Sequence, residues 1–207
     1  MKKILITGAG GIGGVNFVRA LKIFKDKFFI VGLDFNKYYL EFPDVDVRVN
    51  SPRHSDPNFI KLLHELIEKH KIDFLHPHPS SEAFVVSQNF DSIKTKTLLP
   101  KPNIISTDKL KTQKILSDLG VNVAQTKIFK NLNSIQTSFE ELGGGPLWIR
   151  AKSGAGGNLS LLCSESKEVE YWMKLWILRG KANIDDFMLQ QFLPGRNIAW
   201  DSFWYEG

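Results

Sequence analysis

One stretch of the chain, residues 143–163, has the composition of a loop that grips phosphate. An apolar run ends in Arg150, and Lys152 follows it closely. The glycines of the loop are Gly154, Gly156 and Gly157. Glycine lets the backbone adopt positive φ and approach an anion, while the two cationic side chains supply charge. A second apolar run follows, so the pattern predicts a β-hairpin with a phosphate-binding loop; an ordinary hairpin with a basic, glycine-rich loop is the alternative.

A second glycine-rich turn lies near the N-terminus. An apolar run centred on Ile4, Leu5 and Ile6 spans residues 3–7, glycines are frequent over 8–14, and apolar residues then recur at helical spacing. Asp34 ends the next predicted strand, about twenty residues further on, where a dinucleotide-binding fold places its ribose-binding acid. This order predicts a Rossmann-like domain, with Gly10 and Gly11 as candidate substrate contacts. For Asp34 the favoured interpretation is structural, a turn residue at the end of a strand.

A third candidate site follows the strand predicted at residues 72–75. The chain there has the sequence HPHPSSE over 76–82. Two histidines two residues apart could bind a metal ion, but no third ligand is evident, so we predict no metal site. Open α/β sheets bind ligands at the carboxyl ends of their strands, which makes Ser80, Ser81 and Glu82 candidate substrate contacts. The same three residues are also natural caps of the next helix.

The predicted elements that position these residues form two α/β parts. Strands and helices alternate up to the prolines at 100–102, with short strands predicted as far as 97–99, and this alternation indicates a parallel sheet. A capped helix at 106–120 opens the second part, which continues through the hairpin. Apolar, strand-forming residues at 198–205 end the sequence, so we expect another segment or chain to complete that sheet.

Composition indicates a folded protein without a nucleic-acid or membrane partner. Of its 207 residues, 43% are hydrophobic, enough for a real core. The net charge of +5 comes from lysines interleaved with acidic residues, and no apolar run approaches the roughly 20 residues of a membrane span. Cys163 is the only cysteine, which excludes an internal disulfide and a cysteine-based zinc site. We expect a cytoplasmic protein.

Four motifs occur in the order found in ATP-grasp proteins. They are the Rossmann-like start, the helix start with Lys109, the hairpin with Arg150, and the segment QQFLPGR at 190–196. Together they resemble most closely the large chain of carbamoyl-phosphate synthase and its stand-alone relatives. The resemblance implies a pre-ATP-grasp domain over 1–105, followed by a partial ATP-grasp domain. That second domain would span 106–207, with a lid subdomain at about 124–188.

The resemblance also implies a function and a set of binding residues. Such enzymes phosphorylate a small-molecule carboxylate with ATP and then join the acyl phosphate to an amine. Lys109, Arg150, Lys152 and the loop glycines would bind the nucleotide phosphates. The adenine would be held by Gln190, Gln191, Phe192 and Leu193. Asn197 would lie near the ribose.

Three departures from the family pattern accompany the resemblance. Asn197 stands where the family commonly has a glutamate that meets the ribose, and Ala151 replaces a common proline. The acidic and amide residues that bind Mg²⁺ in the family would lie downstream of Tyr205. The complete site would then need a further segment, a partner chain or a homodimer.

Two other functions remain open on the sequence alone. The N-terminal glycine turn also resembles the nicotinamide loop of short-chain dehydrogenases and epimerases. Those enzymes need a tyrosine with a lysine four residues later, and the nearest pair, Tyr171 and Lys174, is one residue too close. The other alternative is a non-catalytic nucleotide-binding fragment that a partner chain completes.

Overall fold

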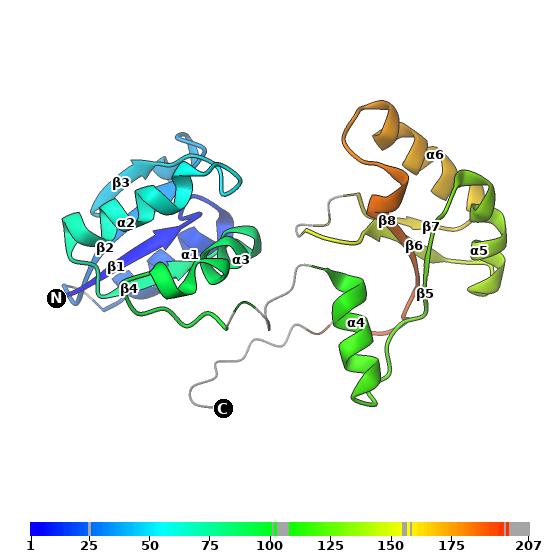
Figure 1. Cartoon of the computed structure of the whole chain (residues 1–207), viewed down its shortest axis with the longest axis horizontal. Coiled ribbons are helices and arrows are strands. Elements are labelled where there is room, and N and C mark those ends of the chain that lie inside the picture. The colour runs from blue at the N-terminus through cyan, green and yellow to red at the C-terminus, as the bar shows by residue number, and fades with distance from the viewer. Residues whose placement is uncertain are drawn as a thin grey trace. The chain divides into compact units, whose positions relative to one another are not determined.

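The computed structural model of the chain describes residues 1–24, 26–100, 102, 108–154, 157, 159–196 and 198. The chain divides into two units, Met1–Lys109 and Leu110–Gly207, each built around one four-stranded sheet (Figure 1). The first sheet is parallel and the second antiparallel, which confirms the predicted α/β class. None of the described helices is long and apolar enough to span a membrane.

The first unit alternates strands with helices. Its strands are β1 (Lys2–Thr7), β2 (Phe28–Asp34), β3 (Val47–Asn50) and β4 (Phe74–Pro77). Its helices are α1 (Ile12–Lys22), α2 (Asn58–His70) and α3 (Ser80–Gln88), with short 3-10 turns η1 (Tyr39–Glu41) and η2 (Phe90–Ser92). The strands run in the order β3-β2-β1-β4. The chain order reverses between β1 and β4, and open α/β sheets bind ligands at such a reversal.

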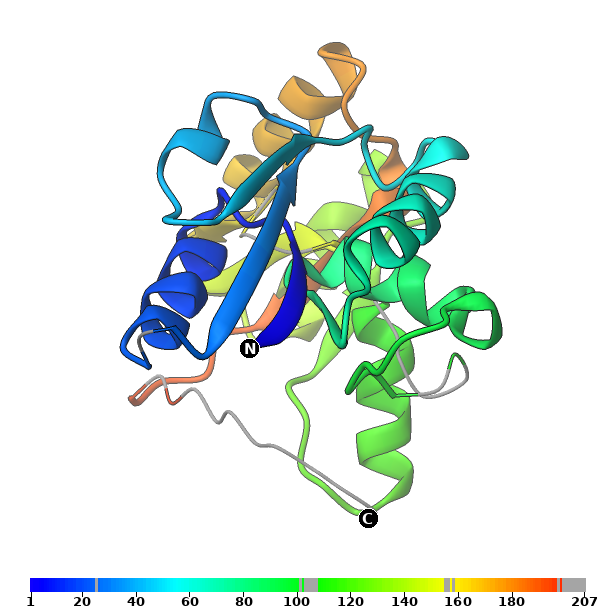
Figure 2. The same ribbon diagram turned by 90° about the vertical axis from the view of Figure 1, so that its left-hand side faces the viewer.

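Helices cover both faces of the parallel sheet, as Figure 2 shows for α1 on one side and α2 with α3 on the other. Successive side chains of a strand point to opposite faces. In β1, Ile4 and Ile6 accordingly pack in the cluster that contains α1 residues, and Leu5 packs with Phe59 and Leu63 of α2. A strand buried on both sides is apolar along its length, which explains why β1 was recognisable from sequence.

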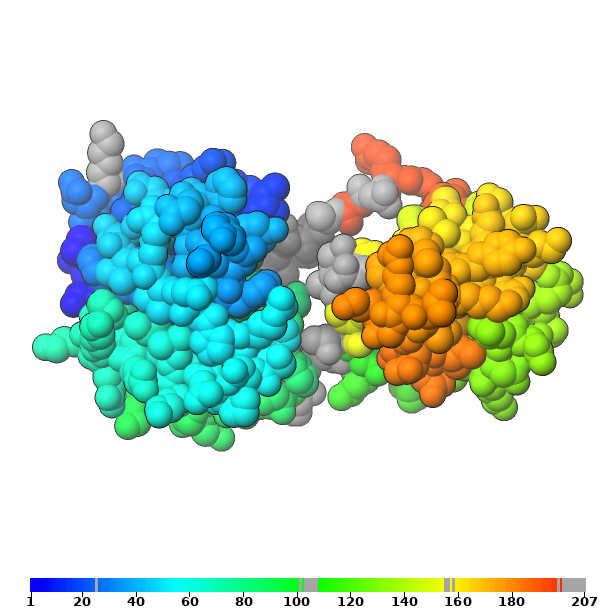
Figure 3. Space-filling model, turned by 90° about the horizontal axis from the view of Figure 1, so that it is seen from above, coloured from blue at the N-terminus to red at the C-terminus, as the bar shows by residue number. Residues whose placement is uncertain are grey.

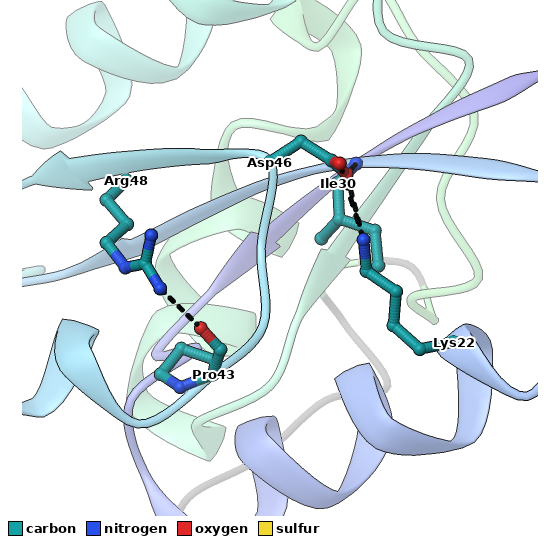
Figure 4. Close-up of polar contacts among 5 residues, drawn as sticks. All are labelled: Lys22, Ile30, Pro43, Asp46 and Arg48. Carbon is teal, nitrogen blue, oxygen red and sulfur yellow. Dashed lines mark hydrogen bonds and ion pairs between the residues drawn. The ribbon is translucent and has the colours of Figure 1, made fainter. Parts of the chain in front are cut away.

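Asp46 secures the crossover between β2 and β3 (Figure 4). Its carboxylate accepts the backbone N–H of Ile30 at 2.7 Å and lies 3.3 Å from the ammonium of Lys22 on α1. Arg48 donates from Nη2 to the carbonyl oxygen of Pro43 at 3.1 Å. The ion pair is partly exposed and contributes little by itself, but the backbone contacts fix where the segment after β2 lies.

The strand expected at residues 97–99 does not form. Only Lys96 makes an isolated parallel bridge, to Phe74 at the start of β4. The prediction was wrong because a short run of strand-forming residues needs a full set of ladder bonds, and the chain leaves the sheet edge after one. The strand expected at 198–205 lies, apart from Ile198, outside the described residues.

The second unit begins with a helix and continues into an antiparallel sheet. Its helices are α4 (Lys109–Asp118), which starts on the last residue of the first unit, α5 (Ile135–Glu141) and α6 (Ser166–Leu178). Its strands are β5 (Thr126–Ile128), β6 (Leu147–Ala151), β7 (Leu161–Cys163) and β8 (Phe187–Gln191). Two 3-10 turns, η3 (Leu132–Ser134) and η4 (Ile184–Asp186), connect them. The strands run in the order β5-β8-β6-β7.

One face of the antiparallel sheet forms the core with α5 and α6. Ile149 and Leu189, directly opposite in β6 and β8, pack with Phe139 of α5 and with Val169 and Met173 of α6. In Figure 1 both helices lie on the same side of this sheet, and the outer side of α6 forms part of the yellow and orange surface in Figure 3. The alternate residues of β5, β6 and β8 therefore point to the other face.

Candidate functional site

The predicted hairpin is confirmed and places Arg150 near the end of β6. Leu147 to Ile149 pair antiparallel with β7, and Leu147 to Ala151 pair antiparallel with β8. The backbone N–H of Lys152 donates to the carbonyl oxygen of Asp186 at 2.8 Å, which fixes the point where the loop leaves the sheet. A loop that closes over an anion needs a fixed attachment to the sheet and glycines beyond that point.

The glycines of the loop are needed for backbone conformation and not for space. Gly154 has φ +89° and Gly157 has φ +69°, values that side chains with a Cβ rarely adopt. A Cβ at either position would have no heavy atom within 4 Å. Gly156, the third predicted phosphate contact of the loop, lies outside the described residues.

Arg150 belongs to a polar chain that crosses three adjacent strands. Its Nη1 donates to Oε1 of Gln190 at 3.0 Å, and Nε2 of Gln190 donates to Oγ1 of Thr126 at 3.1 Å. The Thr126 hydroxyl donates to the carbonyl oxygen of Ala124 at 3.1 Å. Gln190 is 9% exposed. Ile149 and Leu189 face the α5–α6 core, so the next residues along their strands, Arg150 and Gln190, point to the other face of the sheet. Thr126 lies directly opposite Gln190 and points to the same face.

One donor of Arg150 has no acceptor in the part of the chain that the structure describes. Its Nε is buried and makes no hydrogen bond within the described part of the chain. A buried N–H without a partner costs about 1–3 kcal/mol, and such a group calls for an explanation. A phosphate oxygen at this position would supply the missing acceptor, so the side chain fits the nucleotide phosphates that the sequence resemblance implies.

The remaining nucleotide candidates lie at or just beyond the end of β8. The backbone N–H of Gln191 donates to the carbonyl oxygen of Gln125 at 2.9 Å, and its Oε1 accepts the Gln125 N–H at 3.3 Å. Phe192 is half-buried and Leu193 is 62% exposed, and both follow the last residue of the strand. Asn197 lies outside the described residues.

Lys109 is the first residue of α4 and the last of the first unit. The structure thus brings Arg150 and Gln190 into contact and places Lys152 at the loop base. The part played by Lys109 stays a prediction.

The N-terminal glycine turn is filled by protein atoms. A Cβ on Gly8, whose φ is +58°, would lie 2.5 Å from Cδ of Pro79, and one on Gly10 would lie 2.5 Å from Cβ of Tyr39. The Gly11 N–H is used internally, donating to the carbonyl oxygen of Gly8 at 3.1 Å. The glycines therefore permit close packing of the chain against itself, and the amides predicted to meet a substrate have partners.

Asp34 has the structural role that the sequence favoured. It is 4% exposed, and its two carboxylate oxygens accept the backbone N–H groups of Gly10 at 3.2 Å and Asn36 at 2.9 Å. Asn50 donates to the carbonyl oxygens of Asp34 and Phe35 at 3.0 and 3.1 Å. The two backbone amides hold the carboxylate in place, and its burial leaves a ribose hydroxyl little access to it in this arrangement.

Glu82 is a buried acid on α3, close to Thr7 at the end of β1. It is 4% exposed, and its Oε2 and the Thr7 Oγ1 make no hydrogen bond of ordinary geometry within the described residues. Burial raises the pKa of Glu82 to about 7; the charge of Asp34 acts in the same direction, and the nearby Thr7 hydroxyl acts against both. Ser80 does begin α3, but the cap position is Pro79 and no side-chain cap bond forms, so the predicted caps were wrong.

The two histidines for which we predict no metal site, His76 and His78, pack over α1. Phe17 stacks on His76 with ring centroids 4.1 Å apart, and His76 Nε2 lies 3.4 Å from His78 Nδ1. A Cβ on Gly13 would lie 2.7 Å from Cε1 of His78. The His78 ring thus covers the start of α1, where a dinucleotide phosphate would otherwise approach the helix. No sequence pattern predicts this contact, because it depends on how the end of β4 packs against α1.

The tyrosine and lysine considered for a dehydrogenase lie on the outside of α6. Tyr171 is 65% exposed, and Lys174 forms an ion pair with Glu170. A lysine held by a carboxylate one helical turn away is poorly suited to lowering the pKa of a phenol.

The chain has the fold of ATP-grasp ligases at low sequence identity. N5-carboxyaminoimidazole synthetase from Staphylococcus aureus, complexed with ADP, is 19% identical over 93% of this chain and 48% of its own, with a TM-score of 0.66. L-amino acid ligase from Bacillus licheniformis is 13% identical over 94% and 45%, with a TM-score of 0.67.

The biotin carboxylase domain of Hydrogenobacter thermophilus 2-oxoglutarate carboxylase is 17% identical over 93% and 44%, with a TM-score of 0.64. No protein-family model and no curated protein matches the sequence. The chain spans about half the length of the solved structures it matches. Its two units have the fold of the corresponding part of an ATP-grasp ligase.

Proposed function

We propose that the chain is the nucleotide-binding part of an ATP-dependent carboxylate–amine ligase. The observation that carries the proposal is the buried Nε of Arg150, which has no acceptor among the described residues and lies beside a glycine loop on a sheet with this fold. Arg150 and Lys152 would neutralise charge on the phosphate oxygens, and the loop of Gly154 and Gly157 would exclude water. Phe192 and Leu193, directly after β8, would contact the base.

The proposed reaction has two steps. A carboxylate oxygen of the first substrate attacks the terminal phosphorus of ATP, an acyl phosphate forms and ADP leaves. The amine of the second substrate then attacks the acyl carbon, a C–N bond forms and phosphate leaves. The charged transition state of the first step is what the cationic residues on β6 and its loop would stabilise.

The described residues do not fit a Mg²⁺ site by themselves. Among them no group of three or more His, Cys, Asp or Glu side chains could hold a metal ion. We propose that Mg²⁺ ligands come from a further segment, a second copy or a partner chain. This requirement keeps a non-catalytic nucleotide-binding role for the isolated chain as the second candidate.

Two finer assignments belong to the same proposal. Arg150 is an arginine as in carbamoyl-phosphate synthase, which favours that branch of the ligases. Ser80, Ser81 and Glu82 follow β4 at the reversal of strand order and would face the substrate side of the first unit. A nicotinamide cofactor is disfavoured, because Pro79, Tyr39 and His78 fill the positions over the glycine turn.

Calorimetry with the Arg150→Ala variant tests the proposal. The variant should bind ATP about tenfold or more weakly than the wild type, since a charge-assisted hydrogen bond contributes about 1.5–3 kcal/mol. Its unfolding midpoint should change little, because the lost bond to Gln190 is offset by removal of a buried N–H that has no acceptor among the described residues. Lys130→Ala, which removes an exposed lysine after β5, is the matched control. Equal ATP affinity of Arg150→Ala and wild type would remove Arg150 from the site.

A further inference from the structure

The hydrogen bonds from Arg150 to Ala124 run in one direction. A guanidinium can only donate, so Gln190 must present its Oε1 to Arg150 and its Nε2 to Thr126. The Thr126 hydroxyl, which accepts from Gln190, gives its own proton to the Ala124 carbonyl oxygen. Each group has one role, and the orientation of the Gln190 amide is thereby set.

This chain uses one edge of the guanidinium and leaves the other for a ligand. Nη1 is engaged by Gln190, whereas Nε is buried and has no acceptor among the described residues. The Nε–H and one N–H of Nη2 are parallel and form the fork that binds two oxygens of one anion. Turning the guanidinium about Cδ–Nε would move Nη1 off Gln190, so the bond to Gln190 also fixes the direction of the fork.

We infer that Gln190, supported by Thr126, is a positioning residue that aims the Nε–Nη2 edge of Arg150 at two oxygens of one phosphate group. The inference rests on the proposed nucleotide site and assigns the Gln190 side chain to the arginine, not to the base. A carboxylate at position 190 would act differently from the amide. It would pair with the guanidinium charge and compete with the phosphate, so glutamate should weaken anion binding at least as much as an apolar residue.

Four variants separate positioning from a general loss of structure. Gln190→Met removes the amide and keeps the side-chain length, and Gln190→Glu adds the competing charge. Thr126→Val leaves Nε2 of Gln190 without its acceptor, while Thr126→Ser keeps the hydroxyl and should restore wild-type behaviour. Gln125→Met, at an exposed glutamine next to β5, is the matched control.

The probes are inorganic tripolyphosphate, which has no base, and adenosine, which has no phosphate. Tripolyphosphate should bind Gln190→Met about tenfold more weakly than wild type, Gln190→Glu at least as weakly, and Thr126→Val severalfold more weakly. Adenosine affinity should stay within about twofold in all of them. The Arg150 Nε–H resonance, identified by its loss in Arg150→Lys, should shift on adding tripolyphosphate to wild type and shift less in Gln190→Met.

The outcomes distinguish this inference from the proposed function. Adenosine binding lost in Gln190→Met with tripolyphosphate binding unchanged would assign the amide to the base and overturn the inference, while the ATP site would stand. Tripolyphosphate binding with the expected variant pattern, but no binding of ATP or adenosine, would support the positioning role and defeat the proposed function. An Arg150 Nε–H resonance that tripolyphosphate does not shift would overturn the inference directly.

Discussion

The buried carboxyl group of Glu82 should make the first unit less stable as pH rises. Its pKa is about 7 in the folded chain, against an ordinary value of 4.5, because burial disfavours the charged form. Above the pKa of the unfolded chain, such a group lowers the free energy of unfolding, because the folded chain must either keep the proton or bury the charge. Its unfavourable contribution therefore begins above pH 4.5, grows up to about pH 7 and is constant beyond.

The size of this destabilisation follows from the difference between the two pKa values of Glu82, 4.5 and about 7. Each pH unit is worth about 1.4 kcal/mol per proton, so the ceiling above pH 7 is about 3 kcal/mol. Glu82→Gln keeps the shape and cannot ionise. Relative to wild type it should be about equally stable at pH 4.5 and more stable by up to about 3 kcal/mol at pH 8.

The comparison must be between variant and wild type at each pH, because His76 acts in the same pH range with the opposite sign. Burial lowers the pKa of His76 to about 4, and the neighbouring His78 acts in the same direction. The neutral imidazole therefore stabilises the fold above pH 6.5, and this contribution is lost as pH falls towards 4. The difference between the free energies of unfolding of variant and wild type at one pH does not contain the His76 contribution, because both proteins share it.

Hydrogen exchange of the β1 amides is the appropriate assay. These amides sit in the middle of the parallel sheet, and their opening reports the stability of the first unit. Glu65→Gln removes an exposed carboxyl group on α2 and is the matched control. If the stability difference between Glu82→Gln and wild type is the same at pH 5 and pH 8, the Glu82 carboxyl group does not have the raised pKa described here.

Two further predictions concern packing and hydrogen bonding. Gly8→Ala should destabilise the first unit by more than about 2 kcal/mol, because a Cβ there meets Pro79 and the φ of +58° is strained, whereas Gly120→Ala, with φ +79° and open space, should cost about 1 kcal/mol; equal losses in thermal unfolding would contradict this. Trp172→Phe should cost the second unit about 1 kcal/mol, since the Nε1 donation to the Leu159 carbonyl oxygen at 3.1 Å is lost, and an unchanged urea midpoint would show that this bond contributes nothing.

Local sequence signals located most of the elements. β1 was predictable because both its faces are buried, and the hairpin because glycines separate two apolar runs. The strand expected at 97–99 failed because edge pairing depends on the neighbouring strand and not on the segment itself.

The candidate site was only partly predictable for a related reason. Arg150 could be selected by its type and position, but the role of Gln190 depends on strand order. Thr126 is 64 residues from Gln190, and their contact follows from the antiparallel β5–β8 register. At Asp34 and the glycine turn, by contrast, the sequence pattern of a dinucleotide site is present but the structure does not provide the site. Tyr39 and Pro79 fill the space over the glycines.

We propose that a nucleoside triphosphate binds the β6–β8 face of the second unit and that the N-terminal glycine turn binds no dinucleotide. Backbone amide chemical shifts recorded during separate titrations with ATP and NADH test it most directly. We expect ATP to shift the amide resonances of Arg150, Lys152 and Gln190, and NADH to leave those of residues 8–14 unchanged. NADH shifts at residues 8–14, without any ATP shifts on β6 and β8, would contradict it.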